Sequence, residues 1–277
     1  MGEIRIGISG WTYAGWRGDF YPKGLVHRRE LEYAAGRLTS IEINGSFYSL
    51  QRPTSYARWR DVTPDDFVFA VKGGRFITHL KKLAGVETAL ANFFASGVLA
   101  LGPKLGPFLW QLPEVLTYDA DRLASFFDLL PRTTTRAAEL AKGHDDKVGE
   151  DRALTTTEAE WPLRHALEFR SQTFVTPEAT ALLREHDIGC VLADTAGRWP
   201  KVEESTSDFR YLRLHGDKEL YASGYSSDAL DGWAARCLSW AGDQDVFVYF
   251  DNDAKGFAPH DAEALIRRIS AVTSGSP

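Results

Sequence analysis

Short apolar runs recur along the whole chain, and the pattern of each run predicts a β-strand. In several of them, apolar and polar residues alternate, as they do in a strand with two different faces. Turn-forming or polar residues end each run. The eight predicted strands are Ile4–Ser9, Ser40–Asn44, Phe67–Lys72, Pro107–Leu112, His165–Arg170, Gly189–Asp194, Phe209–Gly216 and Val246–Asn252.

Amphipathic stretches lie between most of these runs. Their apolar residues are spaced three and four positions apart, which predicts helices with one buried face. Some also have strong start signals, such as Thr176-Pro177 followed by an acidic residue. The seven predicted helices are Arg28–Leu38, Thr54–Val62, Val86–Leu101, Asp119–Leu130, Thr176–His186, Ser227–Ala241 and Pro259–Ser270.

Strands that alternate with helices indicate an α/β protein with a parallel sheet, because each crossover returns the chain in the same direction. Eight such units in 277 residues predict a single (β/α)8 TIM barrel. A doubly wound open sheet is the alternative, but no glycine-rich phosphate loop follows the first strand. We expect one domain over residues 1–277, with its core at about residues 4–269.

One polar excursion interrupts this pattern, between the fourth predicted helix and the fifth strand. Residues 131–163 include "TTTR" and "KGHDDKVGED", which are polar and charged. A solvated helix or loop is the interpretation that we favour. A lid over the site is the alternative.

Composition limits the classes of function. The chain has 32 Lys and Arg against 38 Asp and Glu, and its net charge of -6 disfavours binding of nucleic acid by bulk electrostatics. Cys190 and Cys237 lie in apolar surroundings and indicate a reducing compartment. Because no apolar leader precedes the first strand and no apolar run is long enough to span a membrane, we expect a cytoplasmic protein without membrane contact.

Polar residues at the strand ends are the main candidates for a functional site, because barrel enzymes place their sites at the carboxyl ends of the strands. In "SIEIN", Ile41 and Ile43 share one face, which leaves Glu42 and Asn44 to point into the barrel. The same argument selects Glu168 with Arg170, Arg213 with His215, and Tyr249 with Asp251, and Lys72, Gln111 and Asp194 end their own strands.

Aromatic loops follow the first two strands and form the second signal. Aromatic rings at the mouth of a barrel can stack on sugars or bases, or they can cap the core. We expect Trp16, Phe20 and Phe47 to pack in the core, and Trp11, Tyr13 and Tyr48 to contact a ligand.

Nine motifs in this order resemble the YecE-like family, a domain of unknown function with a TIM-barrel fold. They are "GISGWTYAGWRGDFYP", "IEINGSFY", "FVFAVKGGRFITH", "LGPFLWQLP", "HALEFR", "ADTAGRWP", "YLRLHG", "LYASGY" and "VYFDNDAKGFAPHDA". The resemblance runs from Ile4 to about Ile269 and implies a barrel without implying a reaction. One departure follows "EFR": the family usually continues with His-Pro-Ser-Trp or a close variant, whereas this chain has Ser171-Gln172-Thr173-Phe174.

The first hypothesis for function is an enzyme that acts by acid/base chemistry on a small polar or anionic substrate, such as a phosphorylated sugar or a nucleotide fragment. The candidate catalytic residues are Glu42, Glu168, His215 and Asp251. The candidate substrate-binding residues are Trp11, Tyr13, Asn44, Tyr48, Lys72, Gln111, Arg170, Asp194, Arg213 and Asn252.

Other hypotheses stay open beside it. A divalent metal is a variant that we do not favour, because there is one strand-end histidine and no HxH or HExxH spacing. The second hypothesis is a nucleic-acid or damaged-DNA binding protein, with a metal-dependent hydrolase as one form of it, in analogy to the apurinic endonuclease barrels that the family's fold resembles. The third is a non-catalytic ligand-binding protein. The sequence does not indicate an oligomeric state.

Overall fold

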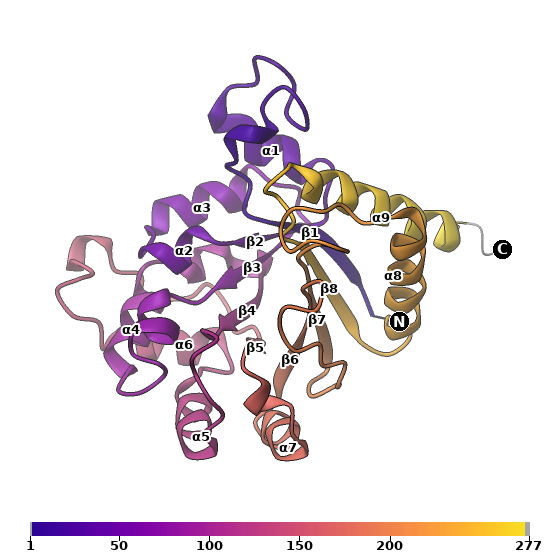
Figure 1. Cartoon of the computed structure of the whole chain (residues 1–277). Coiled ribbons are helices and arrows are strands. Elements are labelled where there is room, and N and C mark those ends of the chain that lie inside the picture. Colours follow the sequence, from indigo (N-terminus) through magenta and orange to yellow (C-terminus); the bar gives the residue numbers. More distant parts are fainter. Residues whose placement is uncertain (1, 275–277) are drawn as a thin grey trace.

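The computed structural model describes residues 2–274, and its centre is a closed barrel of eight parallel strands (Figure 1). Each strand pairs with the next one along the chain, and β1 closes the barrel by pairing with β8. The predicted α/β class and the (β/α)8 barrel are therefore correct. The strands are β1 (Ile4–Ser9), β2 (Ser40–Ile43), β3 (Val68–Lys72), β4 (Leu105–Gln111), β5 (His165–Glu168), β6 (Ile188–Asp194), β7 (Phe209–Leu214) and β8 (Asp245–Phe250).

Helices surround the barrel on most sides (Figure 1). Several start at a capping side chain, for example Thr176, whose hydroxyl accepts a hydrogen bond from the backbone N–H of Ala179. No helix within residues 2–274 is both long and apolar enough to cross a membrane. The α-helices are α1 (Glu30–Ala35), α2 (Gly45–Tyr48), α3 (Pro53–Asp61), α4 (Glu87–Ala95), α5 (Ala120–Leu129), α6 (Thr134–Ala141), α7 (Pro177–Glu185), α8 (Ser227–Trp240) and α9 (Phe257–Ser274).

The predicted helix Val86–Leu101 is shorter in the structure, because α4 ends at Ala95. Gly97 follows with φ 110°, and a Cβ atom there would lie 2.4 Å from Cα of Pro53. Only glycine tolerates both this backbone angle and this close approach. The chain then continues as a 3-10 segment at Val98–Lys104.

The barrel separates two apolar layers. Its lumen holds one cluster of side chains, which includes Leu109, Phe209 and Tyr249, whereas Ile41 and Ile43 belong to the layer under the helices. The alternation expected in β2 is therefore correct, since Glu42 points into the lumen, where it contacts Arg213. The charged side chains that face the lumen lie beyond this cluster, toward the carboxyl ends of the strands.

The polar excursion contains α6, in agreement with the favoured helix-or-loop interpretation, although one face of this helix is buried rather than solvated. Its buried face packs against α4, and Leu154 donates a backbone hydrogen bond to Ala95 at the end of α4. An isolated bridge between Thr133 and Pro162 joins the two ends of the excursion. Movement of residues 131–163 as a lid stays a prediction.

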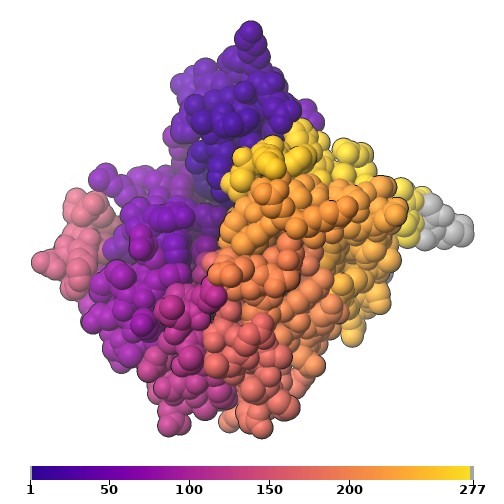
Figure 2. All heavy atoms as spheres, in the orientation of Figure 1, coloured from indigo at the N-terminus to yellow at the C-terminus, as the bar shows by residue number. Residues whose placement is uncertain are grey.

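The first loop and the last helix meet beside the barrel, where the N-terminal segment touches α9 (Figure 2). Nε2 of His260 lies 3.0 Å from a carboxylate oxygen of Asp19. The two ends of the fold are thus held together by side chains as well as by the pairing of β1 with β8.

Candidate functional site

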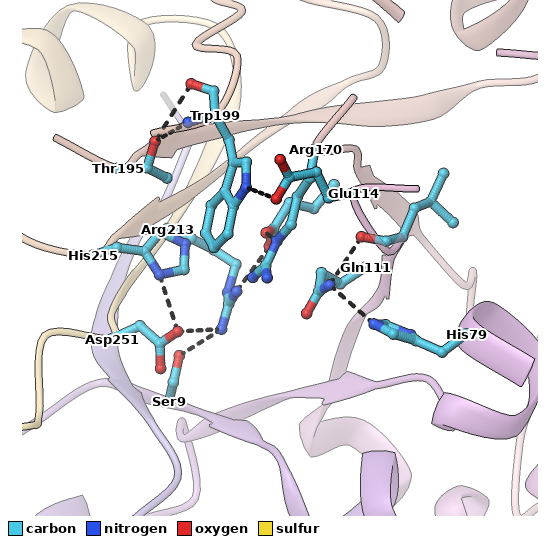
Figure 3. A network of polar contacts seen from close by, with 12 residues as sticks. Ser9, His79, Gln111, Glu114, Arg170, Thr195, Trp199, Arg213, His215 and Asp251 are labelled. Carbon is cyan, nitrogen blue, oxygen red and sulfur yellow. Dashed lines mark hydrogen bonds and ion pairs between the residues drawn. The ribbon is translucent and has the colours of Figure 1, made fainter. Parts of the chain in front are cut away.

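Arg213 is the centre of a buried polar network at the carboxyl ends of the strands (Figure 3). Its guanidinium donates from Nε and Nη2 to both carboxylate oxygens of Glu42, over 3.1 and 2.9 Å. Nη1 donates to Glu168 over 2.8 Å, and Nη2 also donates to Asp251 over 3.0 Å. One cation therefore joins three carboxylates from different strand ends.

Strand register brings the members of the network together. Ser9 and Glu42 are partners at the ends of β1 and β2, and the Ser9 hydroxyl donates to Glu42 over 3.0 Å. The hydroxyl of Tyr211, two residues before Arg213 on the same face of β7, donates to the other oxygen of Glu42 over 2.7 Å. Glu42 thus accepts four hydrogen bonds and is held rigidly.

Two of these carboxylates are kept ionised. Burial raises the pKa of Glu168, but the charges of Arg213 and Arg170 outweigh this effect and bring it from 4.5 to about 2. Burial also raises the pKa of Asp251, and Arg213 together with His215 brings it below its usual range. At neutral pH neither carboxylate has a proton to donate.

Arg170 lies beside this network, next to the indole ring of Trp199 (Figure 3). Its guanidinium carbon is 3.7 Å from the ring centroid of Trp199, and its Nε donates to Glu168 over 3.1 Å. Nε1 of Trp199 donates to Glu114 over 3.0 Å, which fixes the indole. Nη2 of Arg170 donates to Tyr221 over 3.3 Å, and Nη1 of Arg170 has no hydrogen-bond partner within residues 2–274.

Lys72, the last residue of β3, differs from the other charged groups of the site. Its side chain is 8% exposed, and within residues 2–274 its ammonium has a cation–π contact with Phe47, at 4.5 Å, but neither an ion pair nor a hydrogen bond. Burial and the charge of Arg213 lower the pKa of Lys72, nearby carboxylates offset part of this change, and the net effect is a fall from 10.5 to about 8. The amine therefore exchanges its proton near physiological pH.

Two histidines complete the mouth of the barrel. His215 is fully buried; its Nδ1 lies 3.0 Å from a carboxylate oxygen of Asp251, but neither ring nitrogen meets the geometry of a hydrogen bond with the described residues. His79 lies beside Gln111, with 3.5 Å between their nitrogens. Burial, with the charge of Lys72, lowers the pKa of His79 to about 4, so its imidazole is neutral at physiological pH.

Three predicted residues stand close to this network without joining it. The Tyr13 hydroxyl donates to the backbone of Ser9 over 2.7 Å. Asn44 is the N-cap residue of α2, and its buried Oδ1 has no partner among residues 2–274. Asp194 accepts from Lys201 and Tyr225, and its backbone carbonyl accepts from the N–H of His215.

Three other predicted residues lie elsewhere. The Trp11 ring packs against Trp59, with 5.2 Å between ring centroids. Tyr48 is 71% exposed and lines a separate cavity. The Asn252 amide donates to Asp261 over 2.8 Å and to the backbone of Ser223, so it fastens a loop to α9. The structure does not bring these three side chains to Arg213.

Five residues of the site were absent from the predicted set. Tyr211 could have been found by the same alternation, because it shares a face of its strand with Arg213. Ser9 could have been found as the polar last residue of the first strand. Loop residues have no such periodic signal, and for them the fold was needed. The five are Ser9, His79, Trp199, Tyr211 and Tyr221.

The unusual stretch after Arg170 forms a 3-10 turn, Gln172–Phe174, with Ser171 as its cap. Phe174 is buried and stacks on Phe169, with 4.9 Å between ring centroids. The Thr173 hydroxyl accepts from the backbone of Tyr118 over 2.8 Å. Phe174 and Thr173 therefore contact neighbouring residues beside the site.

Within residues 2–274, no group of three or more His, Cys, Asp or Glu side chains is arranged so that it could hold a metal ion. In the network, the guanidinium of Arg213 stands between Glu42, Glu168 and Asp251, where a cation would have to bind.

Comparison with known proteins identifies the family. The profile of the family described as "Protein of unknown function DUF72" matches residues 5–276, so the chain belongs to this family. It is 29% identical to the UPF0759 protein YunF of Bacillus subtilis (strain 168), over 98% of this chain and 96% of YunF. It is 28% identical to the UPF0759 protein YecE of Escherichia coli (strain K12), over 152 residues, about half the length of each chain.

A solved structure shares the fold. A DUF72 family protein from Thermotoga maritima MSB8 superposes with a TM-score of 0.76 at 21% identity, covering 97% of this chain and 99% of that one. A DUF72 family protein from Enterococcus faecalis V583 has a TM-score of 0.72 at 16% identity, with 96% and 95% coverage. These similarities support the barrel fold and the resemblance to YecE-like proteins that the sequence motifs indicated.

Proposed function

We propose that this member of the DUF72 family is an enzyme that transfers a proton to or from a small anionic substrate, such as a phosphorylated sugar or a nucleotide fragment. The observation that carries the proposal is Lys72, a buried amine without a carboxylate partner in the described chain and with a pKa of about 8. Desolvating a lysine is costly, and such groups are concentrated at catalytic sites.

In this proposal His215 accepts a proton from the substrate, and Lys72 donates a proton to it. We assign the imidazole proton to Nδ1, which lies 3.0 Å from Asp251, and this leaves Nε2 as the acceptor. The Lys72 ammonium donates a proton at another substrate atom, and the two groups exchange roles in the reverse direction. A pKa near the working pH suits this task, because both protonation states are populated.

The carboxylates have supporting roles. Glu42 and Glu168 are both paired with Arg213, so we assign to them the positioning of that guanidinium rather than proton transfer. Because Arg213 already serves three carboxylates, we assign the substrate's negative charge to Nη1 of Arg170 and to Lys72.

Deuterium exchange tests the proposal. The protein would be purified from its host and examined by native mass spectrometry for a retained small molecule. That molecule, with a panel of sugar phosphates and nucleoside monophosphates, would then be incubated with the protein in D₂O. We expect incorporation of deuterium into one substrate with the wild type and with Lys23→Met, an exposed control, but at least a hundredfold less with Lys72→Met. Equal incorporation by Lys72→Met, or none by the wild type, would contradict the proposal.

A further inference from the structure

A cavity of about 510 Å³ lies beside the mouth of the barrel, between α2, α4 and the π-helical turn Phe76–Leu80. We call it the aromatic pocket; Phe47, Tyr48, Phe76 and Phe93 contribute to its lining. Its volume is in the range of ordinary small-molecule sites.

The lining of the aromatic pocket is unusually apolar for a surface. Tyr48, Leu50 and Phe76 are 71%, 38% and 43% exposed, and Leu80, in the same π-helical turn, is 62% exposed. Large apolar side chains gathered at one exposed place mark a binding site rather than random surface composition. Single π-helical turns are also frequent at functional sites.

The charges at the pocket are predominantly positive. Arg75, Lys81 and Lys147 line it together with one acid, Asp145. Asp145 is already satisfied, since it accepts from Asn92 and from the backbone of Lys147 and lies 3.6 Å from the Lys147 ammonium. Within the described residues, Arg75 and Lys81 have no carboxylate partner. An anion bound there would meet two unneutralised cations.

The pocket adjoins the network through one ring. Phe47 lines the pocket, and the same ring contacts the Lys72 ammonium at 4.5 Å and His79 at 5.1 Å, measured to its centroid. A ligand in the pocket therefore lies next to the group to which we assign proton transfer.

We propose that the aromatic pocket binds the planar ring of an aryl anion, with the ring against Phe76 and Tyr48 and the negative group at Arg75 and Lys81. This binding site does not rest on the proposed function, which assigns the negative charge of its substrate to Arg170 and Lys72. The ring chemistry is shared by mononucleotides, by other aryl phosphates and carboxylates, and by the bases of a nucleic-acid strand. The volume of about 510 Å³ favours a small molecule.

Binding of phenyl phosphate and of inorganic phosphate, measured by isothermal titration calorimetry, tests the inference. We expect phenyl phosphate to bind at least about tenfold more tightly, because aromatic stacking adds to the charge interaction. Phe76→Ala should remove most of this preference, and Lys81→Gln should weaken phenyl phosphate severalfold. Phe257→Ala is the matched control, since Phe257 is 39% exposed and outside the pocket.

Equal binding of the two probes, or an equal loss with Phe257→Ala, would overturn the inference. A single-stranded oligonucleotide that binds more tightly than AMP, with affinity that falls steeply with salt, would overturn the small-molecule assignment. Lys72 is unchanged in all these variants, so the deuterium-exchange result stays independent of this one.

Discussion

Replacing Glu168 with glutamine removes one of the three negative charges around Arg213 while it keeps the size of the side chain. Glu168 is 1% exposed and accepts from Arg213 over 2.8 Å and from Arg170 over 3.1 Å. Folding lowers the pKa of Glu168 from 4.5 to about 2. This change corresponds to about 3 kcal/mol of folding stability at neutral pH.

The sign of the pH dependence follows from the lowered pKa. The contribution of Glu168 is fully present above about pH 5, and it is lost as the pH falls toward 2, where the folded carboxylate also takes up a proton. Urea unfolding of the wild type and of Glu168→Gln should therefore differ by about 3 kcal/mol at pH 7, and by progressively less below pH 4.5.

Glu158→Gln is the matched control. Glu158 is 71% exposed and pairs with Arg60 over 3.3 Å, so we expect a loss below about 1 kcal/mol. A Glu168→Gln variant that is as stable as this control at pH 7, or whose deficit is the same at pH 7 and pH 4, would refute the buried ion network.

Three further substitutions test other parts of the account by urea unfolding. Lys72→Met should raise the free energy of unfolding at pH 7 by up to about 3 kcal/mol, because folding lowers the pKa of the lysine. The gain should shrink as the pH rises from 8 to 10.5, and a destabilised variant would contradict this. Gly97→Ala should cost more than about 2 kcal/mol, since its Cβ would lie 2.4 Å from Pro53 at φ 110°; a neutral effect would show that this turn is not tight. Gly232→Ala, at an exposed position of α8 with no atom within 4 Å, should instead stabilise by about 0.5–1 kcal/mol, and a loss there would contradict the open surroundings.

Much of the fold could be predicted from sequence because the strands of a barrel are short and regularly alternating. Ile41 and Glu42 show this clearly, since their alternation follows directly from the pleat of β2. The predicted helix that continued through Gly97 was wrong because Gly97 takes a left-handed φ of 110° just after α4 ends; the apolar periodicity on both sides of the glycine hid this local stop signal.

The candidate site was predictable at the strand ends but not beyond them. Alternation indicated that Arg213 and Glu168 face inward, although it did not show that one guanidinium joins three carboxylates. Trp199 and His79 come from loops whose direction depends on the whole fold. The same limit applies to Asn252, which has the right position in sequence but turns toward Asp261.

The most direct test of the central claim is the titration of Lys72 itself. Lysine labelled with ¹³C at Cε would be followed by NMR from pH 6 to 11, with the Lys72→Met variant to assign the signal. We predict a titration midpoint near pH 8 for Lys72, because burial and the charge of Arg213 disfavour its charged form. A midpoint above about 10, as for an exposed lysine, would contradict the role of Lys72 in proton transfer.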